Sequence, residues 1–188
     1  DVYKRQVHVQ TPLVLGDRLF LSTAYNKGCA LIHLGDDVAG ETLWANKRLR
    51  NKVTGTFLHG EHIYGFDESM LKCIDLEGNE AWRVRGLGMG SLAIAGDRLI
   101  ILSSKGELVI AEASPDSYVE LSRRPVLEGG VYWTMPVLVD GLLYVRNSEG
   151  TMHCLDHRID AAGRAAPEPD RQASAPDAAS LYAAHATR

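Results

Sequence analysis

Three cysteines are the first candidates for chemistry in this sequence of 188 residues. Cys73 and Cys154 each lie 13 residues after a glycine of a predicted tight turn, Gly60 and Gly141. Cys29 lies at a similar place in its own part of the chain, although an additional glycine beside it weakens the equivalence. Equivalent positions in separate repeats are too far apart for a disulfide, whose Cα atoms lie about 4.4–6.8 Å apart. We therefore expect all three cysteines to pack as small core residues.

Histidines and carboxylates also form pairs that suggest metal sites. His59 and His62 are three residues apart across a tight turn, whereas a helical zinc site needs two histidines four residues apart. His153 and His157 are four apart, but an extended strand of ~3.3 Å per residue separates them by about 13 Å. Asp67, with Glu68 beside it, lies in a predicted turn where carboxylates accept backbone N–H groups. We expect no metal ligand and no catalytic residue among them.

Gly86, Gly88 and Gly90 have a spacing typical of phosphate-binding loops. Such loops open a helix whose first N–H groups bind the phosphate, but here the apolar run of residues 91–95 predicts a strand. We interpret the glycines as a linker that needs positive φ angles or a close backbone approach.

Composition excludes several classes of protein. Twenty Lys and Arg against 24 Asp and Glu give a net charge of −4, which argues against a nucleic-acid partner. No apolar run approaches the roughly 18 residues of a membrane span. Residues 1–8 lack the order of a signal peptide, so we expect a non-native or linker segment and a missing natural N-terminus. Residues 158–188 are rich in Ala and Pro and are predicted to be disordered.

The elements that position these residues emerge from a repeat in residues 9–157. Four times, a glycine separates two short apolar runs, at intervals of 44, 36 and 45 residues, which predicts four β-hairpins. A third strand follows each hairpin, and in two repeats a fourth strand carries Trp four residues after a Gly. The repeat positions are Gly16, Gly60, Gly96, Gly141, Trp44 and Trp82.

Four antiparallel strands that recur about every 40 residues predict an all-β fold, a partial β-propeller of about four blades with four strands each. A helical solenoid is excluded because the apolar runs are short and bounded by Gly. We expect Trp44 and Trp82 to stack between blades, with each indole N–H bonded to a backbone carbonyl.

Residues 71–82 (LKCIDLEGNEAW) resemble the repeat of pyrroloquinoline-quinone-like (PQQ-like) β-propellers, in which a strand ending in Asp leads to a turn and a docking Trp. Asp36, Gly40 and Trp44 match nearly the same spacing. Residues 86–91 and 133–136 resemble stretches of exported bacterial members of this family. The resemblance covers all four repeats and implies a periplasmic or otherwise exported protein.

Members of this family are either quinone-dependent dehydrogenases or non-catalytic scaffolds. The dehydrogenases cover the quinone with a disulfide between adjacent cysteines and bind Ca²⁺ beside a catalytic Asp, but this sequence has no Cys-Cys pair. We therefore predict a binding or scaffold module without a cofactor, which meets a protein or a small ligand through its blade-connecting loops. The alternative is a fragment of a PQQ-dependent alcohol or sugar dehydrogenase, with PQQ and calcium.

Within that interpretation, the loops nearest a central channel are the candidate binding positions. We assign Gly86, Gly88, Gly90 and Trp133 to them, because these residues come directly before predicted inner strands. About 150 folded residues correspond to four blades of about 40, whereas members of this family close rings in the upper part of the range of about 4–8 blades. We therefore expect part of a ring, with exposed edges.

Overall fold

The computed structural model describes residues 10–35 and 40–159. Within these ranges the chain is all-β, with four antiparallel sheets and no helix, which confirms the predicted fold class. The predicted segment 1–8, nearly all of the predicted tail 158–188, and Asp36 lie outside the described residues.

Each sheet is a meander whose strands pair in chain order, and we call the sheets blades 1 to 4. The fourth has three strands in the described part of the chain, one fewer than predicted. Their bounds are β1 (Leu13–Leu15), β2 (Arg18–Thr23), β3 (Gly28–His33) and β4 (Glu41–Asn46) in blade 1; β5 (Phe57–His59), β6 (His62–Asp67), β7 (Met70–Asp75) and β8 (Glu80–Val84) in blade 2; β9 (Ser91–Ala95), β10 (Arg98–Leu102), β11 (Glu107–Glu112) and β12 (Glu120–Pro125) in blade 3; and β13 (Val137–Val139), β14 (Leu142–Arg146) and β15 (Met152–Asp156) in blade 4.

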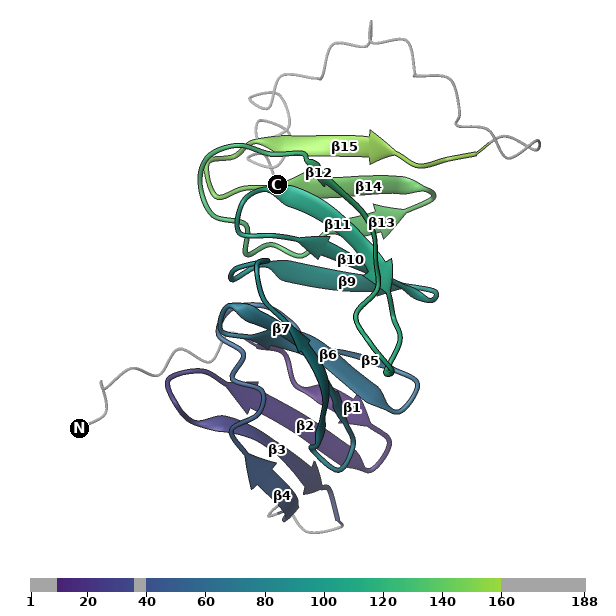
Figure 1. Ribbon diagram of the computed structural model, residues 1–188. Helices are drawn as coiled ribbons and strands as arrows, with labels where there is room; N and C mark the ends of the chain where they lie inside the picture. Colours follow the sequence, from purple (N-terminus) through teal and green to yellow (C-terminus); the bar gives the residue numbers. More distant parts are fainter. Residues whose placement is uncertain (1–9, 36–39, 160–188) are drawn as a thin grey trace, which may run out of the picture.

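The blades stack face to face in chain order, from blade 1 at the bottom of Figure 1 to blade 4 at the top. Each pair of neighbours encloses its own apolar core. Phe20 and Ile63 meet between blades 1 and 2, Tyr64 and Leu99 between blades 2 and 3, and Ile100 and Leu143 between blades 3 and 4. Alternate residues of a strand face opposite sides, so each inner blade contributes to two cores.

The first hairpin of each blade has a two-residue turn. In the first three blades its first residue is a glycine with positive φ, such as Gly16 at 65°. In blade 4 the register pairs Val139 with Leu142, so the turn begins at Asp140 and Gly141 is its second residue. Both have positive φ, which Asp tolerates better than most residues. The residue equivalent to Phe20, Tyr64 and Ile100 is therefore Tyr144.

Both repeat tryptophans connect their blade to the next one. Trp44 Nε1 donates to the carbonyl of Leu76 at 2.8 Å, and Trp82 Nε1 donates to the carbonyl of Ser114 at the same distance. The Trp82 ring lies between Tyr64 and Tyr118, with centroids 5.8 Å apart in each pair. Each indole thus combines ring packing with a hydrogen bond that fixes the neighbouring blade.

A pair of glycine substitutions separates backbone strain from crowding between blades. Gly16 and Gly106 both have positive φ, but a Cβ on Gly16 meets nothing within 4 Å, whereas one on Gly106 collides with the carbonyl oxygen of Leu127. We expect Gly16→Ala to cost about 1 kcal/mol of unfolding free energy, because only the backbone is strained. Gly106→Ala should cost at least about 2 kcal/mol more, because the linker must move. Urea denaturation measures both values, and equal losses would contradict the crowding.

Candidate functional site

The linkers that join successive blades gather beside the first strands of the sheets. β5 and β9, the first strands of blades 2 and 3, are in contact. Residues just before β1, β5 and β13 line one cleft of about 490 Å³, which we call the channel-mouth cleft. It is lined by Thr11, Pro12, Leu13, Val53, Thr54, Gly55, Thr56, Phe57, Trp133, Thr134 and Met135.

Two large apolar side chains of this cleft are exposed. Trp133 and Met135 have 45% and 43% of their surface accessible. Their segment is nevertheless held in place: Ser91 Oγ donates to the Thr134 carbonyl at 2.8 Å, and the preceding residue, Tyr132, is buried. An exposed aromatic ring on a fixed backbone loses little conformational freedom when it binds a partner.

The linker before β5, which also lines the cleft, is held in place as well. Asn51 is buried, and its side chain accepts from the backbone N–H of Thr54 and donates to the carbonyl of Gly55. Thr56 accepts a hydrogen bond of 2.6 Å from Gln10. The cleft therefore exists before any ligand arrives.

The structure does not bring the four predicted channel-facing residues to one place. Trp133 lines the channel-mouth cleft, whereas Gly86 and Gly88 line a separate hollow beside Ser69 and Met70. Gly88 has a φ of 65°, and a Cβ there collides with Ser104. The glycines allow the linker to lie close to the β10–β11 turn, in agreement with their interpretation as a linker.

The cysteines are free, and two of them are buried. Burial raises the pKa of the Cys73 thiol to about 11, so it stays protonated at neutral pH. The expectation of core packing fails for Cys154, which is exposed on the outer face of blade 4. The described part of the chain contains no group of three or more His, Cys, Asp or Glu side chains that are close enough to hold a metal ion.

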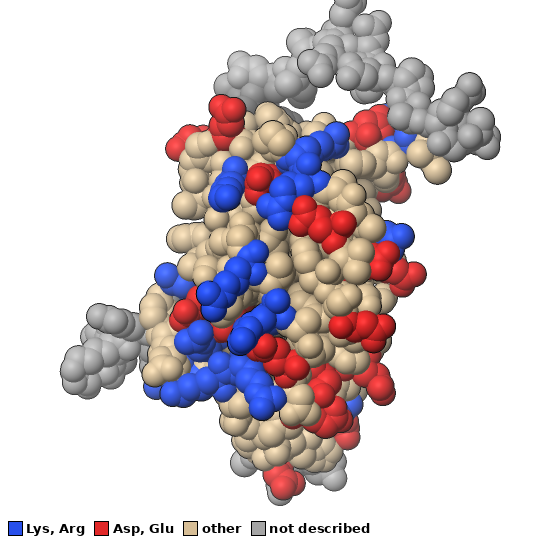
Figure 2. All heavy atoms as spheres, in the orientation of Figure 1, with Lys and Arg blue, Asp and Glu red and all other residues tan. Residues whose placement is uncertain are grey.

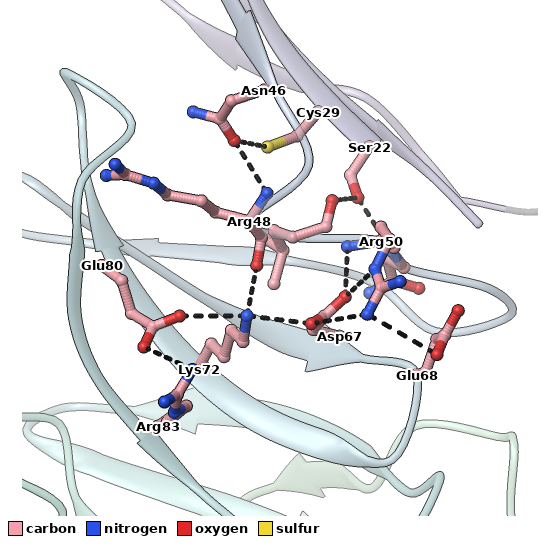
Figure 3. Close-up of polar contacts among 12 residues, drawn as sticks. Ser22, Cys29, Asn46, Arg48, Arg50, Asp67, Glu68, Lys72, Glu80 and Arg83 are labelled. Atoms are coloured by element: carbon pink, nitrogen blue, oxygen red, sulfur yellow. Dashed lines mark hydrogen bonds and ion pairs between the residues drawn. The ribbon is translucent and has the colours of Figure 1, made fainter. Parts of the chain in front are cut away.

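A buried ionic cluster, which the sequence analysis missed, joins blades 1 and 2 (Figure 3). Lys72 and Asp67 are 5% and 1% exposed, and their charged groups lie 2.9 Å apart. Lys72 Nζ also lies 3.0 Å from Glu80 and donates to the carbonyl of Arg48 at 2.7 Å. Arg50, on the linker from blade 1, donates to Asp67 from its backbone N–H and its side chain. We call Arg50, Asp67, Lys72 and Glu80 the Lys72 cluster.

The pairing of charges within the Lys72 cluster indicates a structural role. Burial alone raises the pKa of Asp67, but hydrogen bonds from Arg50 and Lys72 outweigh it and lower the pKa below its usual value. Each charged group has a partner of opposite charge inside the cluster, so none of these groups is left to bind a substrate. The cluster holds the linker that forms one wall of the channel-mouth cleft.

Cationic side chains gather in an oblique band across one face of the molecule (Figure 2). Residues 47–52 (KRLRNK), between blades 1 and 2, carry four positive charges. Arg48 donates to the carbonyl of Gly78, Arg50 belongs to the Lys72 cluster, and Lys52 lies 5.7 Å from the ring centroid of Tyr25. Three of these four cations therefore contact neighbouring elements.

No protein-family model and no curated protein matches the sequence. Solved structures do match. BamB from Moraxella catarrhalis has a TM-score of 0.60 and 16% identity over 77% of this chain and 42% of its own. The computationally designed Ika8 protein has a TM-score of 0.61 and 11% identity over 78% and 44% of the two chains. The designed Ika4 protein has a TM-score of 0.57 and 10% identity over 82% and 94%.

At these identities the likeness concerns the fold alone, which is that of a β-propeller. The chain spans less than half the length of BamB and of Ika8. In the described ranges, no helix is long and apolar enough to cross a membrane.

Proposed function

We propose that this chain is a non-catalytic binding module whose channel-mouth cleft receives an extended, apolar segment of a partner protein. The observation that carries the proposal is the exposed pair Trp133 and Met135 beside a preformed cleft. Ligand sites combine an apolar lining with a few placed polar groups, and here Thr11 and Thr134, the less buried threonines of the lining, supply them. Aromatic anchors at such places carry most of the binding energy of an interface.

The chemistry of the lining favours an uncharged ligand. The channel-mouth cleft is lined by apolar residues, threonines and one glycine, and by no Lys or Arg. PQQ carries three carboxylates, so it would gain no opposite charge there. This supports an uncharged segment, rather than PQQ, as the occupant of this cleft. We also propose an exported, periplasmic setting, supported by the resemblance of residues 86–91 and 133–136 to exported bacterial members of the family.

Selection of peptides from a random library tests the proposal. We expect the peptides retained by the protein to be rich in aromatic and aliphatic residues. Trp133→Ala should weaken the binding of a selected peptide about 30-fold, as expected for an interface hot spot of ~2 kcal/mol, whereas Trp133→Phe should keep most of the affinity. Fluorescence anisotropy measures these affinities.

Leu121 provides a matched control, because it is 47% exposed on β12, away from the cleft. Leu121→Ala should leave peptide affinity unchanged. Peptide binding that survives Trp133→Ala would contradict the assignment of the cleft. Stoichiometric binding of PQQ with Ca²⁺, followed by reduction of a dye by an alcohol or a sugar, would support the dehydrogenase alternative.

A further inference from the structure

Among the described residues, no further blade covers either end of the stack (Figure 1), and both end sheets carry exposed apolar side chains such as Val14 and Val137. On blade 4, Val137, Tyr144 and Cys154 pair across neighbouring strands and so share one face, on which Val137 is 50% exposed. On blade 1, Leu21 and Ala30 pair and line a groove of about 430 Å³. These two surfaces are the outer faces of blades 4 and 1.

The outer face of blade 4 has the same residue types as the face of blade 2 that is buried against blade 3. Tyr144 pairs with Cys154 in the register in which Tyr64 pairs with Cys73. Tyr64 and Cys73 are fully buried against blade 3, whereas Cys154 is exposed. The same residue types at the same positions indicate a face that is made to contact a following blade.

The outer face of blade 1 has the complementary pattern. Leu19 pairs with Ile32 there, as Ile63 pairs with Ile74 in blade 2. Ile63 and Ile74 are fully buried against blade 1. Leu19 and Ile32 are only partly buried. Blade 1 therefore presents the surface that, within the stack, always contacts a preceding blade.

We propose that a second copy of this chain covers both faces, with blade 4 of each copy against blade 1 of the other, in a closed ring of eight blades. The outer face of blade 4 in one copy and the outer face of blade 1 in the other have the same residue patterns as the two surfaces that meet at each interface within the stack. Two such contacts, related by a two-fold axis, close the ring, so that every sheet face contacts another blade. Propellers have about 4–8 blades, so two copies reach the upper end of this range and three copies exceed it.

Two comparisons of length support a second copy as the occupant. The chain spans 42% of BamB and 44% of Ika8, so two copies supply nearly the whole extent of either protein. It spans 94% of Ika4, so a propeller chain of about this extent occurs as a solved protein. Further blades on a longer polypeptide are the competing occupant, which the experiment below distinguishes.

Sedimentation equilibrium of the 188-residue chain tests this inference. We expect a dimer, twice the 20.6 kDa of one chain. Tyr144→Arg on blade 4 and Leu21→Asp on blade 1 should each give a monomer, because each places a charge in both contacts of the ring. An equimolar mixture of the two variants should recover dimers, because one contact then joins two unchanged faces. Pairing of blade 4 with blade 4 would instead leave Leu21→Asp dimeric, and this result would overturn the proposal.

Thiol labelling gives a second readout that reports folding at the same time. In the dimer, Cys154 should become as unreactive toward a disulfide reagent as the buried Cys73, and in the Leu21→Asp monomer it should react at least about tenfold faster. Continued protection of Cys73 shows that the variant is folded. Leu121→Arg, on an exposed strand away from both faces, should remain a dimer. A folded wild-type monomer with a reactive Cys154 overturns the proposal and favours further blades of a longer chain.

Discussion

Replacement of Asp67 by leucine should lower the free energy of unfolding by about 3–5 kcal/mol, the typical cost of removing one partner from a buried ion pair. Asp67 is 1% exposed and contacts both Lys72 and Arg50. Without it, Lys72 keeps Glu80 and a backbone carbonyl but loses its nearest carboxylate. The linker between blades 1 and 2 loses the acceptor for the backbone N–H of Arg50.

The dependence of stability on pH distinguishes this loss of charge from a defect in packing. The pKa of Asp67 is lowered in the folded protein, so its contribution is complete above the unfolded value of about 3.9 and is lost as the pH falls through the lower, folded value. Urea denaturation from pH 7 to pH 3 should show this loss in the wild type and a reduced loss in Asp67→Leu.

Glu68 is the matched control for this experiment. It is half exposed and lies 3.6 Å from Arg50, so Glu68→Gln should change the free energy of unfolding by less than about 0.5 kcal/mol. Similar losses from Glu68→Gln and Asp67→Leu would refute the role of the Lys72 cluster.

Replacement of Trp82 by alanine should cost about 3–5 kcal/mol, as for other large aromatic residues in a core. Its ring packs against Tyr64 and Tyr118, and its N–H bonds the carbonyl of Ser114 beyond β11. Trp82→Phe keeps much of the ring contact and should lose only about 1 kcal/mol, the value of one hydrogen bond.

Trp133 is the matched control for Trp82, because the same truncation there removes an exposed ring. We expect Trp133→Ala to cost less unfolding free energy than Trp82→Ala, because 45% of Trp133 is exposed against 9% of Trp82, so less buried surface is lost. Guanidinium denaturation measures all three variants. A loss in Trp82→Ala no larger than that in Trp133→Ala would contradict the docking role of Trp82.

The hairpins and the stacking of blades could be predicted from the sequence because their signals are local. A glycine between two apolar runs specifies a tight turn at almost any place in the chain. The turn of blade 4 shows where this signal fails: Asp140 accepts the positive φ that glycine has in the other blades, so the repeat glycine identified the turn but not its first residue. An aspartate in that position is one of the few substitutes for glycine.

The candidate site was only partly predictable, because its parts come from different blades. Trp133 stood out as an aromatic residue directly before a predicted inner strand, but the linker residues Thr54 and Thr56 gave no signal of their own. The role of Asp67 was also missed, since a carboxylate in a turn normally binds nearby backbone and its partner Arg50 lies 17 residues earlier. A lysine inside the apolar strand β7 was the available hint, because a buried Lys needs a carboxylate.

The contacts between blades join residues that are close in sequence, and this has a consequence for folding during translation. Each strand pairs only with strands next to it in sequence. The hydrogen bonds from the indole N–H groups of Trp44 and Trp82 to the next blade each span 32 residues. No blade among the described residues waits for a strand from the far end of the chain. At about 5–20 residues per second, a new blade leaves the exit tunnel every few seconds. Blade 1 can fold and offer a finished surface to blade 2 while translation continues.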